Sequence, residues 1–303
     1  MKVLVPQPVH ADGIQFLKDH GLQVIELEND SREEIDKYIE AATAILVRTT
    51  PLQAEQLERG NKLQVIARHG VGLDLIDTKY CEQNGIKVCN TPVANVNSVA
   101  EHVTGFLLSI AHRIPEAERA IRRGNYESRH VLIGQEVKGK TLGLIGFGNI
   151  AQSVAKKCAL GLGMNVIAYD PYAKEFPEYV EQVKELETIA QQSHFVSVHV
   201  PLNDATENLI DRPFFHLMQS GSYLINAARG GIVNETALTE AIDTERIAGA
   251  ALDCYAEEPI PLDFPLKDYE NVLLTPHMAA HTEDSMRAMA LGAAEAIVRA
   301  IKF

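Results

Sequence analysis

One short stretch, TLGLIGFGNIAQSVAKKC at residues 141–158, limits the possible folds of this chain more than any other. It begins with an apolar run typical of a buried strand, and its second half has apolar residues four apart, as on one face of a helix. Small residues stand between them at Gly146, Gly148 and Ala151, in the pattern G-x-G-x-x-A. A strand that enters a helix through such a turn leaves backbone N–H groups at the helix N-terminus, where the helix dipole favours an anion. The stretch therefore predicts a turn that binds pyrophosphate.

An acidic residue follows this turn at the spacing expected of a dinucleotide-binding fold. The next predicted strand, NVIAYD, ends in Asp170, 22 residues after Gly148. A carboxylate at that point can accept hydrogen bonds from the ribose hydroxyls and repels a 2′-phosphate. Glycine patterns also occur in ordinary strand-to-helix connections, and Asp170 could be an exposed acid in a turn. The strand, glycines, helix and acid together favour dinucleotide binding, with NAD preferred to NADP.

Strands and helices alternate along the whole chain, which is the pattern of doubly wound parallel α/β sheets. Five candidate strands (KVLVP, LQVIELE, AILVRT, LQVIARH and IKVCN) precede the glycine turn, so they must form an α/β domain of their own. Five more (NVIAYD, HFVSVHV, SYLINAA, IAGAALD and NVLLTPH) follow it. Helices are expected at 32–42, 97–112, 149–158 and 283–302. The helix at 97–112 follows the turn-rich NTPVANVNS, and we interpret it as the first crossing between two domains.

Charge and apolar pattern argue against several classes of protein. The formal net charge of −13 disfavours a nucleic-acid-binding surface, which needs a basic face. No apolar run approaches the roughly 18 residues of a membrane span, and the N-terminus has no signal-peptide pattern. We therefore expect a cytoplasmic protein that binds neither nucleic acid nor a membrane. The cysteines lack C-x-x-C spacing and lie in apolar surroundings, so we expect reduced thiols and no metal site; they are Cys81, Cys89, Cys158 and Cys254.

Polar residues gather after the predicted strands, where open α/β sheets bind their ligands. Arginines, histidines and an aspartate form a set suited to an anionic substrate and to proton transfer. The set consists of Arg48, Arg68, His69, Asn90 and Thr91 in the first half of the chain and of His199, Asn226, Arg229, Asp253 and His277 in the second.

Six segments together resemble the D-isomer-specific 2-hydroxyacid dehydrogenases, and most closely the phosphoglycerate dehydrogenase branch. They are ARHGVGLDLID, NTPVANVNSVAEH, GKTLGLIGFGNIA, INAARGGIVNETAL, AALDCYAEEP and NVLLTPHMAAHT, in the order and near the spacings of that family. The resemblance implies an α/β fold of two Rossmann-like, doubly wound parallel-sheet domains with a cleft between them. It implies a substrate-binding domain at 1–96, to which a C-terminal helix at 279–303 returns, and an NAD-binding domain at 97–278.

The same resemblance implies three catalytic residues. Arg229 of NAARGG would pair with the substrate carboxylate and polarise the C2 oxygen, and no acid follows it before Glu235. His277 of TPHMAA would take up and return the proton of the C2 hydroxyl. Glu258 would lie against the imidazole, favour its protonated form and fix its tautomer, with the adjacent Glu257 as the alternative.

Cofactor contacts are implied as well. Asp253 would lie near the nicotinamide carboxamide, and His199 would line the nicotinamide pocket without proton chemistry. The expected NAD-binding residues are Gly146, Gly148, Asn149, Ile150, Asp170, Val200, Pro201, Thr206, Ala227, Ala228, Arg229, Asp253, His277 and Ala279. Asn149 departs from the family, since many members have an arginine there that contacts pyrophosphate. Ala279 and Ala280 stand where glycine is common, which could narrow the nicotinamide pocket.

Substrate contacts are expected from the loop RHGVG, whose N–H groups at Val71 and Gly72 could hold a carboxylate, with a plain turn as the alternative. Arg48 and Arg68 could bind a phosphate, although Arg48 could also form a structural ion pair. The expected substrate-binding residues are Arg48, Arg68, His69, Val71, Gly72, Arg229 and His277. His102, on the crossing helix, is predicted to be a packed interdomain residue.

The function predicted from these residues is NAD-dependent hydride transfer at C2 of a small, anionic D-2-hydroxy acid or 2-oxo acid. The pair 3-phosphoglycerate and phosphohydroxypyruvate is the first choice of substrate, with glyoxylate or hydroxypyruvate reduction as the alternative. An NAD-sensing binding protein of the same fold is a third interpretation. The helix at 97–112 is too apolar to cover only its own domain, so we also expect a homodimer.

Overall fold

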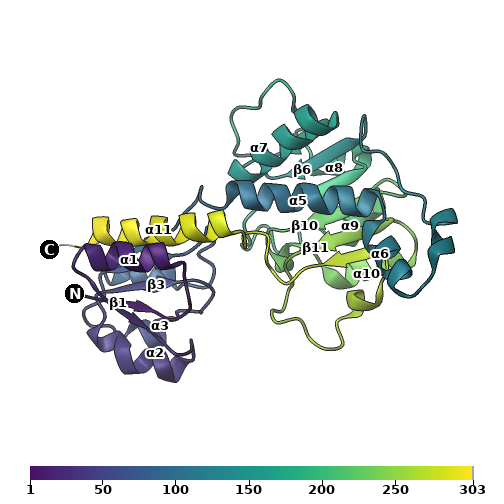
Figure 1. Cartoon of the computed structure of the whole chain (residues 1–303). Helices are drawn as coiled ribbons and strands as arrows, with labels where there is room; N and C mark the ends of the chain where they lie inside the picture. Colours follow the sequence, from purple (N-terminus) through teal and green to yellow (C-terminus); the bar gives the residue numbers. More distant parts are fainter. Residues whose placement is uncertain (302–303) are drawn as a thin grey trace. The chain divides into compact units, whose positions relative to one another are not determined.

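The computed structural model describes residues 1–301 and divides the chain into two compact α/β units (Figure 1). The first unit contains Met1–Val96 and the chain from Ala280 onward, and the second contains Asn97–Ala279. Each unit is built on one sheet in which every strand pair is parallel. The predicted fold class, two doubly wound parallel α/β sheets, is therefore confirmed.

The first unit has a five-stranded sheet in the order β2-β1-β3-β4-β5. Its strands are β1 (Lys2–Val5), β2 (Gln23–Glu26), β3 (Ala44–Val47), β4 (Val65–Arg68) and β5 (Lys87–Cys89). Its helices are α1 (Ala11–Asp19), α2 (Arg32–Tyr38), α3 (Ala54–Leu57), α4 (Thr78–Gln83) and α11 (Glu283–Ala300).

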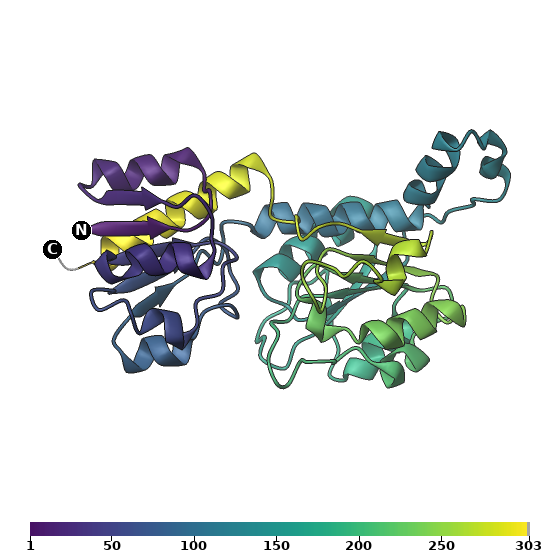
Figure 2. The same ribbon diagram turned by 90° about the horizontal axis from the view of Figure 1, so that it is seen from below.

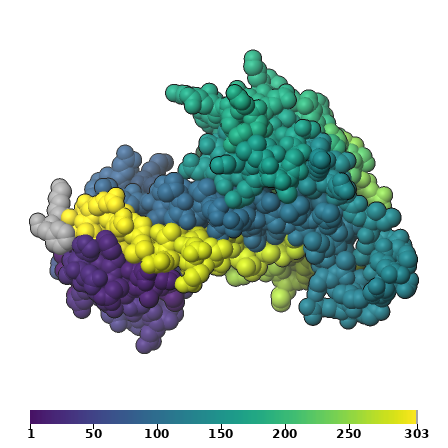
Figure 3. Space-filling view, turned by 45° about the horizontal axis from the view of Figure 1, so that its top comes forward, coloured from purple at the N-terminus to yellow at the C-terminus, as the bar shows by residue number. Residues whose placement is uncertain are grey.

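Alternate residues of each central strand face two separate cores, as expected of a sheet covered on both sides. On one face, Val3 and Leu46 pack with α1 and α11, which lie side by side (Figures 1 and 3). On the other face, Leu4 and Ile45 pack with α2, α3 and α4. The C-terminal helix is thus an integral part of the first unit, because its residues Ala293 and Ile297 are fully buried there.

The second unit has a seven-stranded sheet in the order β12-β11-β10-β9-β6-β7-β8. Its strands are β6 (Thr141–Ile145), β7 (Asn165–Tyr169), β8 (Glu181–Gln182), β9 (Phe195–Val198), β10 (Tyr223–Asn226), β11 (Gly249–Leu252) and β12 (Val272–Leu274). Its helices are α5 (Val96–Ala111), α6 (Ile114–Arg122), α7 (Asn149–Lys156), α8 (Leu186–Gln192), α9 (Arg212–Leu217) and α10 (Glu235–Asp243). The strand order reverses between β6 and β9, which is where doubly wound sheets bind their ligands.

Two sequence-based expectations need correction. The helix after the glycine turn is regular only to Lys156 and continues as one π-helical turn, Lys157–Gly161. The short strand β8 was not predicted, because its two residues are exposed and carry no apolar pattern.

The expected reason for dimer formation was also wrong, because the apolar side chains of α5 are buried within the chain itself, including Val103 and Leu107. Several exposed apolar residues lie after it, on an arm formed by residues 114–136. Figure 2 shows this arm extending to one side of the second unit, to which Arg123, just after α6, is joined by an ion pair with Glu270 at 2.6 Å. No helix among residues 1–301 is both long enough and apolar enough to cross a membrane.

Candidate active site

The turn between β6 and α7 has the geometry of an anion-binding site. Gly146 has φ of +90°, and a Cβ atom there would lie 2.8 Å from the carbonyl oxygen of His199, so only glycine fits. Gly148 is the N-cap of α7, and in the described chain a Cβ added to it would meet no atom within 4 Å. The backbone before α7 is therefore open to an approaching ligand, with exposed Asn149 and half-buried Ile150 in the first turn of the helix.

Asp170 lies beside this turn, just after β7. Its Oδ2 accepts the N–H of Phe147 at 2.8 Å, so the carboxylate is bonded to the glycine turn itself. Its Oδ1 accepts the N–H groups of Tyr172 at 2.8 Å and Ala173 at 3.1 Å. The carboxylate is thus oriented by three backbone donors next to the open end of α7, which is compatible with a ribose on its remaining lone pairs.

The other expected cofactor residues follow β9 and β10. After β9, Thr206 donates a 2.6 Å hydrogen bond to the carbonyl of Pro201 and closes the loop that also contains Val200. After β10, the buried Asn226 amide accepts the N–H of Ala228 at 3.0 Å and donates to the carbonyl of Arg229 at 2.9 Å. These two hydrogen bonds hold residues 227–229 in a fixed loop at the carboxyl end of the sheet.

His277 and Glu258 form the central pair of the site. His277 Nδ1 lies 2.7 Å from Glu258 Oε2, and the second carboxylate oxygen accepts the N–H of Tyr255 at 3.0 Å. Burial raises the pKa of Glu258, but its hydrogen bonds with His277 and Tyr255 N–H and the charges of His277 and Arg229 outweigh burial and hold the pKa below its usual value. Both Glu257 and Glu258 are exposed, but it is Glu258 that contacts His277.

Arg229 belongs to the same electrostatic environment, since its charge contributes to lowering the pKa of Glu258. Its Nη1 donates to the carbonyl of Ala228 at 2.8 Å. The following residue, Gly230, is pressed against the loop after β11, where a Cβ would lie 1.8 Å from the carbonyl carbon of Tyr255. Gly230 is therefore a positioning residue that sequence reasoning missed, although the glycine pair in NAARGG was a visible signal.

Asp253, which is 1% exposed, forms its hydrogen bonds with the loop after β12. Its oxygens accept the N–H groups of Met278 and Ala279, both at 2.8 Å, and the hydroxyl of Thr275 at 2.5 Å. The carboxylate thus holds the loop that carries His277. A contact with nicotinamide remains a prediction.

Other histidines near the strand ends are poor proton carriers. Burial lowers the pKa of His199 to about 4, and its Nε2 lies 2.9 Å from the Ser197 hydroxyl. Burial, reinforced by the charge of Arg48, also lowers the pKa of His69 to about 4. His102 packs within the second unit, edge-on against Phe106. Among residues 1–301, no three His, Cys, Asp or Glu side chains are grouped as they would be around a metal ion.

The expected substrate residues of the first unit lie at the carboxyl end of its own sheet. Arg48 Nη1 donates to the carbonyl of Pro8 at 2.9 Å, and no carboxylate within residues 1–301 forms an ion pair with it. The guanidinium of Arg68 folds over Gly70 and donates to the carbonyl of His69. The half-buried Val71–Gly72 segment is held by Asn90, whose side chain donates to the Val71 carbonyl at 2.8 Å.

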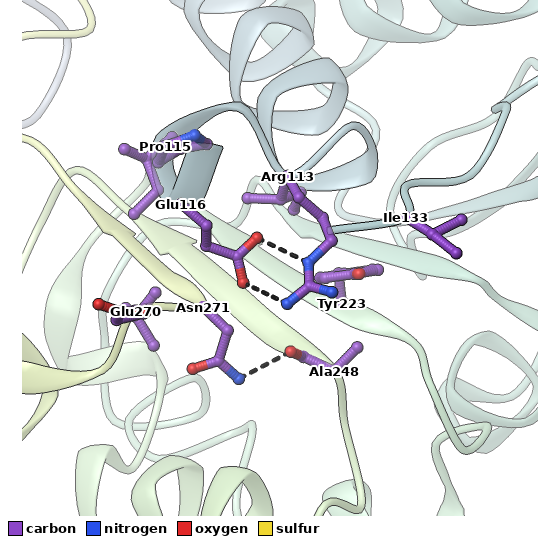
Figure 4. Close-up of a pocket in the computed structure, with 11 residues that line it drawn as sticks. Arg113, Pro115, Glu116, Ile133, Tyr223, Ala248, Glu270 and Asn271 are labelled. Atoms are coloured by element: carbon purple, nitrogen blue, oxygen red, sulfur yellow. Dashed lines mark hydrogen bonds and ion pairs between the residues drawn. The ribbon is translucent and has the colours of Figure 1, made fainter. Parts of the chain in front are cut away.

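A separate cavity of about 240 Å³ lies at the opposite, amino-terminal ends of β10, β11 and β12 (Figure 4). Arg113 and Glu116 lie side by side in its wall and form a two-point ion pair, with distances of 2.8 and 2.9 Å. Tyr223 and Ile133 complete the wall beside this pair. Because His277 follows β12, this cavity and the catalytic cluster occupy different edges of the sheet.

Fold and site together define a Rossmann-type dinucleotide-binding protein. Residues 104–279 match the family model described as "D-isomer specific 2-hydroxyacid dehydrogenase, NAD binding domain". The chain belongs to the D-isomer-specific 2-hydroxyacid dehydrogenase family, as the sequence resemblance indicated. The expected cofactor, NAD, is confirmed by the same match.

The relatives that this chain matches include both phosphoglycerate dehydrogenases and a hydroxypyruvate reductase. The chain is 41% identical to a D-3-phosphoglycerate dehydrogenase of Archaeoglobus fulgidus, over 100% of this chain and 58% of that protein. It is 39% identical to a hydroxypyruvate reductase of Thermotoga maritima, over 98% of this chain and 97% of that protein. The solved NAD-dependent formate dehydrogenase of Staphylococcus aureus, in complex with NAD, is similar with a TM-score of 0.89 and 28% identity, covering 99% of this chain and 95% of that one. The chain therefore spans little more than half the length of the phosphoglycerate dehydrogenase that it matches.

Proposed function

We propose that this chain catalyses NAD-dependent oxidoreduction at C2 of small D-2-hydroxy acids and 2-oxo acids. The observation that carries the proposal is the 2.7 Å pair of His277 and Glu258 within electrostatic reach of Arg229, in a unit of the NAD-binding family. The names of the two relatives support the class of substrate. The four unpaired cysteines fit the reducing cytoplasm, where we place the activity.

NAD fits the open turn at Gly148. The N-terminus of α7 would hold the pyrophosphate, and Asp170 would accept hydrogen bonds from the adenosine ribose. The loops containing Val200, Thr206 and Ala228 would line the rest of the cofactor. When bound, NAD supplies the hydride acceptor for oxidation and, in its reduced form, the hydride donor for reduction.

The guanidinium of Arg229 would bind the substrate carboxylate and polarise the C2 oxygen, since its planar donors match a carboxylate. A carboxylate can only accept a hydrogen bond, so the 2.7 Å contact with Glu258 places a proton on Nδ1 of His277. Nε2 is then left to take the C2 hydroxyl proton during oxidation and to return it during reduction. The lowered pKa of Glu258 keeps its carboxylate charged at neutral pH and stabilises the protonated imidazole.

Phosphohydroxypyruvate is the proposed 2-oxo acid, because Arg48 offers a second site for an anion. Burial lowers the pKa of Arg48, which shows that its charge is partly removed from water, and no carboxylate within residues 1–301 compensates it. A phosphate accepts paired guanidinium donors well. Hydroxypyruvate and glyoxylate, which lack the phosphate, are the alternatives.

The activity is tested by following NADH absorbance with these three acids side by side. The proposal requires His277→Ala to lower kcat by about 10²- to 10⁴-fold, with NADH affinity retained. The exposed His112→Ala variant is the control and should retain the rate. NADH binding without reduction of any 2-oxo acid would favour the NAD-sensing protein instead.

Substrate choice is tested with Arg48→Ala and, as a control, Arg32→Ala, whose side chain forms an exposed ion pair with Glu55. Phosphohydroxypyruvate should lead in kcat/KM by more than tenfold, about 1.4 kcal/mol, and should lose most of that lead only in Arg48→Ala. Equal efficiency with hydroxypyruvate or glyoxylate would assign the chain as a reductase of those acids.

We also propose that two copies of the chain associate through the arm at 114–136. Several of its apolar side chains are exposed, including Val131 at 71% and Ile133 at 76%. Contact of apolar side chains with water is unfavourable, so an apolar surface of this kind is typical of an interface. Ile133 also borders the cavity of Figure 4, so a partner's side chains have a recess to enter. Light scattering at micromolar concentration should give a dimer mass, which Ile133→Asp should halve and Leu262→Asp, at a still more exposed leucine outside the arm, should not. A monomeric parent chain would contradict the proposal.

A further inference from the structure

The backbone of His277 has a conformation that needs support from its surroundings. Its φ of +49° lies in the left-handed region, which is uncommon for a residue with a side chain. The bond from His277 N–H to the carbonyl of Thr275, at 3.0 Å, belongs to the same tight turn. Such a conformation persists only where neighbouring groups hold the chain on both sides.

The buried carboxylate of Asp253 provides that support on both sides of His277. On the N-terminal side it accepts the hydroxyl of Thr275 at 2.5 Å, and on the C-terminal side it accepts the N–H groups of Met278 and Ala279, both at 2.8 Å. Asp253 is 1% exposed, so these donors replace the water that its charge would otherwise require. A donor lost from this set leaves a buried charge partly unsatisfied.

A fourth group extends the set from α5. His102 Nε2 lies 3.2 Å from the Thr275 hydroxyl oxygen and 3.7 Å from Asp253 Oδ1. The Thr275 hydroxyl gives its proton to the carboxylate, so its oxygen must accept from His102. The hydrogen bonds therefore run in one direction, from His102 Nε2–H to Thr275 and from Thr275 to Asp253. Burial lowers the pKa of His102, against the opposing influence of Asp253, so the ring is neutral with its proton on Nε2.

We propose that Thr275 and His102 are positioning residues for His277, acting through the Asp253 carboxylate to hold the left-handed turn that aims the imidazole at Glu258. The proposal rests on the proposed function, because it concerns the proton-transfer residue of that reaction. Loss of the Thr275 hydroxyl would leave the His102 donor without its acceptor and the buried carboxylate without its shortest hydrogen bond. The turn would then sample other conformations, in which the imidazole no longer holds its 2.7 Å contact with Glu258.

The test compares Thr275→Val, which has nearly the same shape without the hydroxyl, with Thr275→Ser, which keeps it. The first readout uses the chain without substrate: amide hydrogen exchange of Met278 and Ala279 should be about tenfold faster in Thr275→Val and near the parent rate in Thr275→Ser. The second readout is kinetic: kcat should fall by about tenfold to a hundredfold in Thr275→Val, with the KM for NADH within about twofold of the parent. Selective ¹⁵N-histidine spectra should show His102 as the Nε2–H tautomer.

A second pair of variants, at His102, tests the proposal if Thr275→Val does not fold. His102→Gln keeps an N–H donor near the position of Nε2, and His102→Leu removes it, so only His102→Leu should show the faster exchange and the lower kcat. The proposal would be overturned if Thr275→Val and Thr275→Ser had equal exchange rates and equal kcat, or if His102→Leu and His102→Gln did. An Nδ1–H tautomer at His102 would also overturn it. Faster exchange with an unchanged kcat would also overturn it. If the parent chain reduced no 2-oxo acid, the proposed function would fail, while the exchange and tautomer measurements would still decide whether the turn is held in this way.

Discussion

At the scale of single residues, the charge of each group in this site depends on whether its contacts outweigh its burial. Partial burial alone would raise the pKa of Glu258, yet two hydrogen bonds and two nearby positive charges lower it. His199, at the end of β9, has only a Ser197 hydroxyl beside its Nε2, and burial lowers its pKa to about 4. His199 and His277 therefore differ in chemistry, because of the two only His277 has a carboxylate partner.

The first prediction concerns Glu258→Gln. The carboxylate of Glu258 lies 2.7 Å from Nδ1 of His277, so its negative charge stabilises the charged imidazole. Keto-acid reduction needs the imidazolium, so in Glu258→Gln the rate of reduction should be lost at a lower pH than in the parent. The pH profile of kcat/KM for parent and variant measures this, with Glu257→Gln as the matched control. A profile that moved equally in both variants would speak against the pair.

The second prediction concerns Asp170→Asn. An asparagine has one acceptor oxygen, which can take over the hydrogen bonds from the N–H groups of Tyr172 and Ala173. Its NH₂ group cannot accept a hydrogen bond from the N–H of Phe147, so the glycine turn should loosen. The loss of charge also removes repulsion of a 2′-phosphate. The ratio of kcat/KM for NADH over NADPH should fall by about tenfold, or 1.4 kcal/mol, and NADH affinity should fall as well. A parent chain that used both cofactors equally would contradict the assignment of Asp170.

At the scale of elements, the close approach of α1 and α11 joins the two ends of the first unit. A Cβ on Gly13 of α1 would lie 2.8 Å from the carbonyl oxygen and 2.9 Å from the Cβ of Ala290 in α11. Neither helix can move apart easily, because Leu17 and Ile297 are fully buried between them and the sheet. Gly13 is therefore required by packing, in a helix where alanine would otherwise be the better residue.

The third prediction compares Gly13→Ala with Gly105→Ala. Gly13→Ala should lower the free energy of unfolding of the first unit by about 1–3 kcal/mol, because the added methyl group overlaps with α11. Gly105 lies in α5, where an added Cβ would meet no atom of the described chain within 4 Å, so Gly105→Ala should raise the free energy of unfolding of its unit by about 0.5–1 kcal/mol. Urea denaturation of both variants measures the difference. Destabilisation of equal size at both sites would exclude the packing explanation.

At the scale of the whole molecule, buried neutral histidines couple stability to pH. His69 is 4% exposed, its Nε2 lies 3.2 Å from the Met286 carbonyl, and burial lowers its pKa from 6.5 to about 4. The unfolded chain takes up this proton near pH 6.5, whereas the folded chain takes it up only near pH 4. Between these values the unfolded state binds more protons, so stability falls as pH falls.

The fourth prediction follows from this fall of stability with falling pH. Between pH 6.5 and 4, His69 should reduce the free energy of unfolding by up to about 1.4 kcal/mol per pH unit. His69→Gln keeps an N–H donor for Met286 but does not titrate, so the stability difference between parent and variant should change with pH by that slope. Above pH 7 the difference should be constant. Parallel stability curves for parent and variant down to pH 5 would show that His69 contributes nothing.

The sequence by itself determined the order of strands and helices, the parallel sheets and the glycine turn, because these depend on residue patterns within a few positions of one another. It also determined the identity of the NAD-binding family, since several motifs occur together in order. Only the tertiary structure decided that Asp253 holds the His277 turn, that Gly230 packs against the Tyr255 backbone, and that α5 is buried while the arm after it is exposed. These features join residues distant in sequence or depend on the direction of one side chain. Local patterns carry no information on either, because side-chain contacts are set only once the sheets and loops have packed.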